Sequence, residues 1–221
     1  MGLHLLLDSA DKEDWDNWSS YGIFQGITTN PSLIKRTLKH CNIDSLKLLA
    51  RNAEKIGYKE IHLQAWGKTS AELVNCSIAI SKLSTDKLRV YVKLPITNIG
   101  TKAAKEIISF SIPVTFTACY EIDQVLIAAS LGVNYIAPYL GRMNDNGEDG
   151  LAKILKMKST LKGLKSSTQL LIASIRSKNQ ILDMAGKGIR TFTISNEIAK
   201  ELFKSEQTIN AAEEFEKDSQ M

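Results

Sequence analysis

A lysine near the end of a hydrophobic segment is the residue in this sequence best suited to chemistry. Lys93 lies in segment 88–95, Leu-Arg-Val-Tyr-Val-Lys-Leu-Pro, whose β-branched and apolar residues predict a short buried strand. Removing an ammonium group from water is costly unless the charge is paired or neutralised, so burial lowers the pKa of a lysine. A lysine that is neutral near pH 7 is a nucleophile that forms a Schiff base with a ketone or an aldehyde. The sequence therefore predicts a reactive amine, and we expect the groups that serve it to lie nearby.

Polar side chains also stand near the ends of other short apolar segments. Side chains alternate between the two faces of a strand, so residues two apart point the same way. The residues that could meet at one end of a sheet are Asp8, Thr28, Asn30, Gln64, Thr115, Thr117, Tyr139, Arg142, Ser174 and Arg176. They offer a carboxylate, guanidinium groups, amides and hydroxyls, which suit acid–base catalysis and the binding of an anion. The amino-terminal halves of the same segments are mostly apolar by comparison.

Short apolar segments alternate eight times with amphipathic ones, which indicates the architecture that positions these residues. The apolar segments are 3–9, 26–30, 60–66, 88–95, 113–119, 134–141, 169–175 and 191–195. Eightfold strand–helix alternation predicts a closed parallel (β/α)₈ barrel, of the TIM-barrel kind, whose active site lies at the carboxyl ends of the strands. An open doubly wound sheet is the alternative, but no glycine-rich phosphate loop follows the first predicted strand.

The whole chain, residues 1–221, is predicted to be one α/β domain. Residues 206–217 form an additional amphipathic segment after the eighth strand–helix unit. We expect this segment to be a helix that packs on a neighbouring subunit, so the sequence favours a homo-oligomer.

Each polar residue also has an ordinary structural explanation. Asp8 and Asn30 stand where helix caps are common, and Gln64 and Thr117 could satisfy buried backbone groups. Lys93 could bury its aliphatic stem and extend its ammonium group to water. All of these residues are expected near one lysine at one barrel mouth. Residues that serve only as caps or packing groups need not converge in this way, so a functional interpretation is favoured.

Composition excludes several classes of function. The net charge is only +4, and no basic stripe with interleaved aromatic residues is present, so nucleic-acid binding has little support. The three cysteines, Cys41, Cys76 and Cys119, form no CxxC motif, which favours a reducing cytoplasm over a disulfide framework or a zinc site. No signal peptide and no membrane-spanning apolar segment is evident. We expect a cytoplasmic protein that needs no metal or cofactor and contacts neither nucleic acid nor membrane.

Four motifs, in order and spacing, resemble those of the transaldolase family. They correspond to the signature near the start of transaldolases, their Schiff-base lysine segment, their phosphate-side loop and their seventh strand. The motifs are 26–34 (GITTNPSLI), 92–97 (VKLPIT), 136–143 (IAPYLGRM) followed by 149–150 (DG), and 172–176 (IASIR). The likeness covers nearly the whole chain, and the length matches the small subgroup of short transaldolases and fructose-6-phosphate aldolases.

The resemblance implies roles for individual residues and a quaternary structure. It makes Lys93 the Schiff-base nucleophile and Asp8 the acid–base group that handles the proton of the substrate C4 hydroxyl. The remaining matched positions would bind a phosphorylated sugar, Thr28 and Asn30 at its dihydroxyacetone unit and Arg142, Ser174 and Arg176 at its phosphate. Members of the subgroup are typically ring-shaped, so the resemblance also implies a pentamer or a decamer.

The resemblance leaves two activities open. Gln64, Thr117 and Tyr139 resemble residues that hold the catalytic water in the aldolase branch, whereas transaldolases usually carry Glu and Phe at positions 64 and 139. This favours a fructose-6-phosphate aldolase that releases glyceraldehyde 3-phosphate and dihydroxyacetone. Arg176 resembles the second arginine of the transferases. The alternative is therefore a transaldolase of the pentose phosphate pathway, which transfers dihydroxyacetone from fructose 6-phosphate to erythrose 4-phosphate.

Two further classes of protein are weaker alternatives. A binding or structural protein on a barrel scaffold would form no covalent adduct with a ketose phosphate. A metal-dependent or isomerase barrel is disfavoured because no cluster of His, Asp and Glu stands at the predicted strand ends.

Overall fold

The computed structural model describes residues 2–220, so Met1 and Met221, at the ends of the predicted domain, lie outside the described residues. It contains eight β-strands, all of them short and nearly all of them buried. The strands are β1 His4–Asp8, β2 Gly26–Thr28, β3 Glu60–Gln64, β4 Arg89–Pro95, β5 Val114–Cys119, β6 Tyr135–Pro138, β7 Gln169–Leu170 and β8 Thr191–Ile194.

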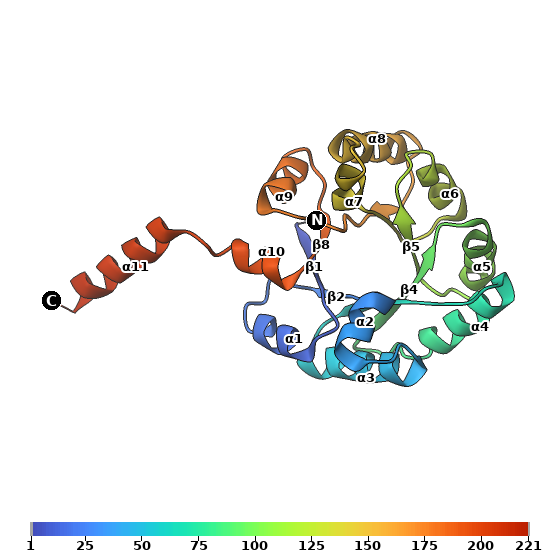
Figure 1. The fold of residues 1–221 in the computed structure, drawn as a ribbon, viewed down its shortest axis with the longest axis horizontal. Helices are drawn as coiled ribbons and strands as arrows, with labels where there is room; N and C mark the ends of the chain where they lie inside the picture. Colours follow the sequence, from blue (N-terminus) through green and yellow to red (C-terminus); the bar gives the residue numbers. More distant parts are fainter. Residues whose placement is uncertain (1, 221) are drawn as a thin grey trace.

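Helices fill the connections and form a ring outside the strands (Figure 1). They are α1 Lys12–Ser19, α2 Pro31–Leu38, α3 Ile43–Ile56, α4 Ser70–Ser81, α5 Asn98–Ser109, α6 Gln124–Leu131, α7 Leu140–Asp145, α8 Gly150–Gly163, α9 Lys178–Ala185, α10 Asn196–Glu201 and α11 Glu206–Ser219. None of the helices in residues 2–220 combines the length and the apolar character needed to cross a membrane.

The strands pair in parallel in the order β7-β6-β5-β4-β3-β2-β1-β8. The remaining gap, between β7 and β8, is bridged where Ile172 pairs with Phe192. The amide of Ile172 donates to the carbonyl of Thr191 at 3.0 Å, and the amide of Thr193 donates to the carbonyl of Ile172 at 2.9 Å. The predicted (β/α)₈ barrel is confirmed, and the open doubly wound alternative is wrong.

Local sequence signals set the helix boundaries. Thr69 and Glu72 form a capping box at the start of α4, in which each side chain binds the other's backbone amide. Gly57 ends α3 with a φ of 105°, a left-handed conformation that glycine adopts without steric cost. Because neighbouring strands pair in parallel, their carboxyl ends lie at one face of the barrel.

Strands six and seven are shorter than their apolar sequences predict. Segment 134–141 gives only β6, because the chain turns into α7 directly after Tyr139. Segment 169–175 gives only β7 and two isolated bridges, since Ser174 has a φ of 60° and so leaves the extended conformation. Tyr139 and Ser174 consequently lie just beyond the strands rather than on them, still at the carboxyl end.

Apolar residues form two cores separated by the sheet. The larger core lies between strands and helices and includes fully buried Trp15 and Phe116. The smaller core fills the barrel interior, where Leu6, Tyr91, Tyr135, Ala137 and Leu171 meet. This plug of side chains closes the barrel below Lys93, so the interior is a packed core and the chemistry is confined to the mouth.

A polar cluster lies in the amino-terminal half of the barrel, contrary to the expectation that these strand halves are mostly apolar. His4 Nε2 lies 2.6 Å from Glu60 Oε1, and the Nε2 atom of fully buried His62 lies 3.7 Å from the same oxygen. Thr115 Oγ1 is 2.9 Å from His62 Nδ1, while His62 Nε2 finds no hydrogen-bond partner among the described residues. Burial opposes ionisation of Glu60, but the hydrogen bond to His4 and the nearby His62 ring lower its pKa to about 2.

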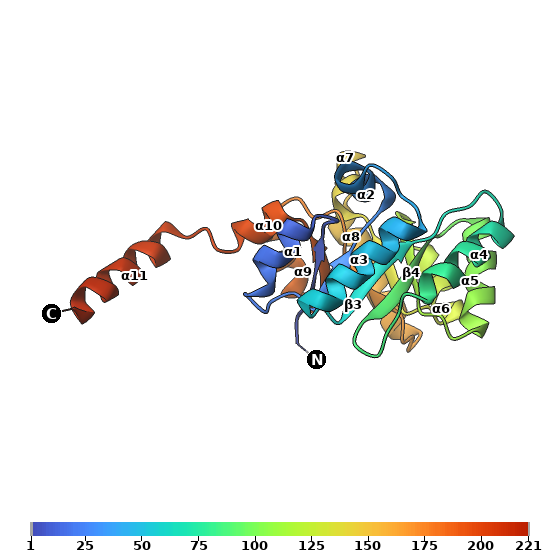
Figure 2. The same ribbon diagram turned by 90° about the horizontal axis from the view of Figure 1, so that it is seen from below.

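Helix α11 projects away from the barrel in both views (Figures 1 and 2). None of its residues is buried, and the side chains of Ile209 and Phe215 are 52% and 70% exposed. The helix spans the predicted segment 206–217, and its packing on a neighbouring subunit remains a prediction.

We predict that His62 makes the fold sensitive to mild acid. Burial lowers the pKa of His62, so below its unfolded pKa of about 6.5 the unfolded chain binds a proton that the folded chain does not. Stability is therefore lost as the pH falls through this value, by roughly 1 kcal/mol between pH 7.5 and 5.5. His62→Phe should remove most of this loss in urea unfolding, whereas His40→Phe, at an exposed histidine, should retain it. Equal pH dependence in wild type and His62→Phe would contradict the prediction.

Candidate active site

Lys93 points into the barrel mouth rather than out to solvent. The residue is 6% exposed, and its Nζ atom donates a hydrogen bond of 2.7 Å to the backbone carbonyl of Thr29. Thr29 follows β2 directly, so the amine reaches across the mouth from β4. The simpler explanation, a buried stem with the ammonium group in water, is wrong.

Asp8 and Thr28 lie side by side at the ends of β1 and β2. The strand register pairs the two residues, and Thr28 Oγ1 donates to Asp8 Oδ1 at 2.7 Å. Thr28 also meets the hydroxyl of Thr193 on β8. Asp8 does not cap the following helix, because Asp11 caps α1. The carboxylate is therefore held by strand ends, and Thr193 joins the site although the sequence analysis did not select it.

Burial shifts the pKa values of Lys93 and Asp8 toward their neutral forms. Burial lowers the pKa of Lys93, and the nearby carboxylate of Asp8 opposes this shift. Burial raises the pKa of Asp8, against the lowering effects of Lys93 and of the Thr28 hydrogen bond. An amine that loses its proton more readily is a better nucleophile, and a carboxyl group with a raised pKa can both accept and return a proton.

Further polar residues stand on both sides of β4, Gln64 on β3 and Thr117 on β5. Gln64 pairs in register with Lys93, and Thr117 pairs with Pro95 two residues farther along β4. The hydroxyls of Thr117 and Tyr139 are 2.6 Å apart. Burial raises the pKa of Tyr139, so its phenol keeps its proton at neutral pH. Two bonded hydroxyls on one side of β4 and an amide on the other are suited to hold a water molecule near the amine.

The predicted anion-binding residues converge at the start of α7. Gly141 donates its amide to the carbonyl of Ser174 at 2.8 Å. A β-carbon at Gly141 would lie 2.2 Å from this carbonyl oxygen and 2.8 Å from Arg176 Nε, so glycine permits the contact. Arg142 is the next residue along the chain. The close approach of α7 to the segment between β7 and α9 therefore brings both arginines to one side of the mouth.

Asn30 caps a helix, as its structural explanation predicts, and it can still bind a substrate. Its Oδ1 atom caps α2 by accepting a hydrogen bond of 3.0 Å from the amide of Leu33. A side-chain amide carries separate donor and acceptor groups, so its nitrogen can still serve a substrate. Figure 2 shows α2 and α7 at the same end of the barrel, opposite the amino terminus.

The predicted site residues thus gather at one barrel mouth, except Thr115, whose hydroxyl bonds His62 in the cluster below the mouth. Direct contacts join Asp8 to Thr28 and Thr117 to Tyr139, while register alone places Gln64 beside Lys93. Surface cavities of about 230 and 480 Å³ lie elsewhere on the molecule and contain none of these residues. Within residues 2–220, no three His, Cys, Asp or Glu side chains are arranged to hold a metal ion.

Comparison with known proteins agrees with this geometry. A family model described as Transaldolase/Fructose-6-phosphate aldolase matches residues 5–221. A probable transaldolase from Carboxydothermus hydrogenoformans is 28% identical over 213 residues, which cover 96% of each chain. A probable transaldolase from Nitrosopumilus maritimus is 29% identical over 222 residues, covering 98% of this chain and 94% of the relative. The chain therefore belongs to the transaldolase/fructose-6-phosphate aldolase family, as its motifs and barrel mouth indicate.

Proposed function

We propose that this protein is a Schiff-base enzyme that removes a dihydroxyacetone unit from fructose 6-phosphate. The observation that carries the proposal is the buried amine of Lys93. Burial lowers its pKa, and the Asp8 carboxyl group is near enough to oppose that shift. A surface lysine would be protonated and unreactive at neutral pH, whereas this one is suited to attack a carbonyl carbon.

In this mechanism the substrate reacts first with the lysine. The lone pair of Lys93 Nζ attacks the C2 ketone, and loss of water gives an iminium ion. Asp8 accepts the proton of the C4 hydroxyl, the C3–C4 bond breaks, and its electrons move into the iminium to form an enamine. Glyceraldehyde 3-phosphate leaves. The amide of Asn30 can hydrogen-bond the dihydroxyacetone unit that stays on the lysine.

The phosphate is held away from the reacting carbons. Arg142 and Arg176 would bind it through charge-assisted hydrogen bonds, with Ser174 beside them. Such a remote contact orients the sugar so that C2 meets the amine and the C4 hydroxyl meets Asp8.

The fate of the enamine decides between aldolase and transaldolase. The bonded hydroxyls of Thr117 and Tyr139, with Gln64 nearby, support a held water that protonates the enamine and hydrolyses the imine. We therefore favour fructose-6-phosphate aldolase activity. Transfer to erythrose 4-phosphate is the second candidate, since Arg176 resembles the second arginine of the transferases and the relatives are named probable transaldolases.

We further propose that the protein is a cytoplasmic homo-oligomer, a pentamer or a decamer, whose α11 packs on a neighbouring subunit. The exposure of Ile209 and Phe215 on a projecting helix supports this arrangement, because apolar side chains gain stability from being covered.

Covalent trapping tests the proposed nucleophile. Borohydride added to the enzyme with fructose 6-phosphate should reduce the iminium and fix a three-carbon or six-carbon unit on Lys93, which mass spectrometry of peptides can locate. Lys93→Ala should abolish the adduct, and Lys105→Ala, at an exposed lysine, should leave it unchanged. An adduct on another residue, or none at all, would refute the Schiff-base mechanism.

Release of glyceraldehyde 3-phosphate with and without erythrose 4-phosphate separates the two activities. We expect sustained turnover without the acceptor. Tyr139→Phe removes one hydroxyl from the proposed water site and should reduce acceptor-independent release about tenfold while changing transfer less than about threefold. Strict dependence on the acceptor in wild type would favour the transaldolase, and equal loss of both rates would exclude the water role of Tyr139.

Sedimentation tests the proposed role of α11. Wild type should sediment as a multiple of the 24.5 kDa chain. Phe215→Asp should shift it toward smaller species, because a charge replaces apolar surface at the contact. Gln207→Asp adds a charge to the same helix without removing apolar surface and serves as the control. A wild-type protein that sediments as a monomer would contradict the prediction.

A further inference from the structure

Arg142 and Arg176 have different surroundings although both are assigned to the substrate phosphate. Arg176 Nη2 lies 3.1 Å from Asp145 Oδ2, an exposed ion pair. Arg142 contacts two aromatic residues instead. Its Nη1 atom donates to the hydroxyl of Tyr120 at 3.3 Å, and its guanidinium carbon lies 5.0 Å from the centre of the Tyr139 ring. These neutral partners orient the guanidinium group without pairing its charge. Asp145 acts on Arg142 electrostatically, but within residues 2–220 its carboxylate is paired with Arg176 and not with Arg142, so the charge of Arg142 is available to an anion.

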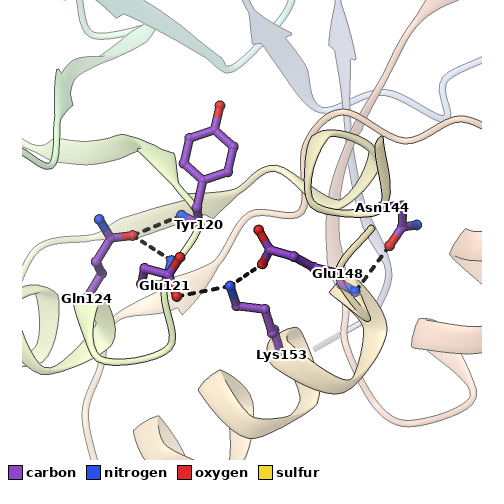
Figure 3. Close-up of polar contacts among 7 residues, drawn as sticks. Tyr120, Glu121, Gln124, Asn144, Glu148 and Lys153 are labelled. Carbon is purple, nitrogen blue, oxygen red and sulfur yellow. Dashed lines mark hydrogen bonds and ion pairs between the residues drawn. The ribbon is translucent and has the colours of Figure 1, made fainter. Parts of the chain in front are cut away.

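Tyr120 is itself firmly placed at the end of β5. Its ring meets the ring of Tyr139 edge-on, with centroids 5.7 Å apart and planes at 72°. The backbone amides of Tyr120 and Glu121 both donate to Gln124 Oε1, at 2.9 and 3.0 Å (Figure 3). These bonds fix the turn into α6. The phenol is thereby aimed at Arg142.

A lysine connects this turn to the segment that carries Arg142. Lys153 on α8 donates to Glu121 at 2.9 Å and also bonds Glu148, and Figure 3 shows its ammonium group between the two carboxylates. The Lys153 side chain is 17% exposed, whereas the carboxylates of Glu148 and Glu121 are 31% and 61% exposed, so the pair with Glu148 is shielded from water more than the pair with Glu121. The β5–α6 turn and the α7–α8 connection are thus joined by one ammonium group.

We propose that Tyr120 positions Arg142 for the phosphate of the substrate, and that Lys153 holds the turn on which Tyr120 stands. The inference rests on the proposed function, because it assigns Tyr120 the selection of phosphorylated over unphosphorylated sugars. The Tyr120 oxygen accepts a hydrogen bond from Arg142, so its own hydrogen remains to be donated to a phosphate oxygen. Tyr120 adds to the binding of the anion and takes no part in bond cleavage.

Steady-state kinetics with Tyr120→Phe tests this role, because the variant loses the hydroxyl and keeps the ring that packs on Tyr139. KM for fructose 6-phosphate should rise about three- to tenfold with kcat changed less than about twofold. KM for unphosphorylated fructose should stay the same. Equal increases for both sugars, or no increase for either, would overturn the proposal.

Matched variants separate positioning from general loss of structure. Lys153→Met should raise KM for fructose 6-phosphate in the same direction, by about two- to fivefold, because the turn is no longer held. Lys156→Met, at an exposed lysine of the same helix, should have no effect, and neither should Tyr21→Phe at an exposed tyrosine. An unchanged KM in Lys153→Met would overturn the role of the ammonium link.

A binding measurement that needs no turnover distinguishes failure of this inference from failure of the proposed function. Inorganic phosphate should shift the side-chain Nε–H NMR signal of Arg142 in wild type, and its apparent affinity should fall about three- to tenfold in Tyr120→Phe. If no ketose adduct forms on Lys93 but this loss of affinity is seen, the proposed reaction is wrong and the role of Tyr120 stands. If phosphate leaves the Arg142 signal unchanged, the role of Tyr120 is wrong.

Discussion

The burial of one ammonium group is the constraint on which this site depends. Lys93 sits at the mouth of a closed ring of strands, where an unpaired positive charge is costly, and burial therefore lowers its pKa. The Asp8 carboxyl group opposes that shift, and burial raises the pKa of Asp8 in turn. The charge state of each group therefore depends on that of the other. A barrel provides such a place because its strand ends converge while its interior is filled below them.

The rest of the mouth is organised around that amine by contacts between strand ends. Thr28 links Asp8 to β8, and the hydroxyls of Thr117 and Tyr139 bond each other on the other side of β4. The arginines lie beyond the strands, Arg142 on α7 and Arg176 on the segment between β7 and α9. A reactive carbon and a phosphate several bonds away can then be bound by separate groups, so that orientation and chemistry are adjusted independently.

The sequence predicted the barrel and most of the mouth because each depends on local patterns. The alternation of strand and helix segments can be read from residues close together in the sequence. The same holds for the helix caps and for the alternation of side chains along β4. Tyr120, Thr193 and the cluster around His62 were missed because their roles arise from contacts between distant strands. Side chains alternate between the two faces of a strand, and this alternation along β8 was the signal that could have identified Thr193. For Tyr120, one residue past β5, no spacing rule indicates a contact with a residue 22 positions away.

The pKa of Lys93 tests the central claim most directly. With lysine labelled at Cε, the carbon signal of Lys93, assigned by its loss in Lys93→Ala, can be followed against pH. Because burial disfavours the ammonium form, we expect its midpoint to lie clearly below the ordinary lysine value of about 10.4. A midpoint at or above that value would show an ordinary charged lysine and would contradict the proposed nucleophile.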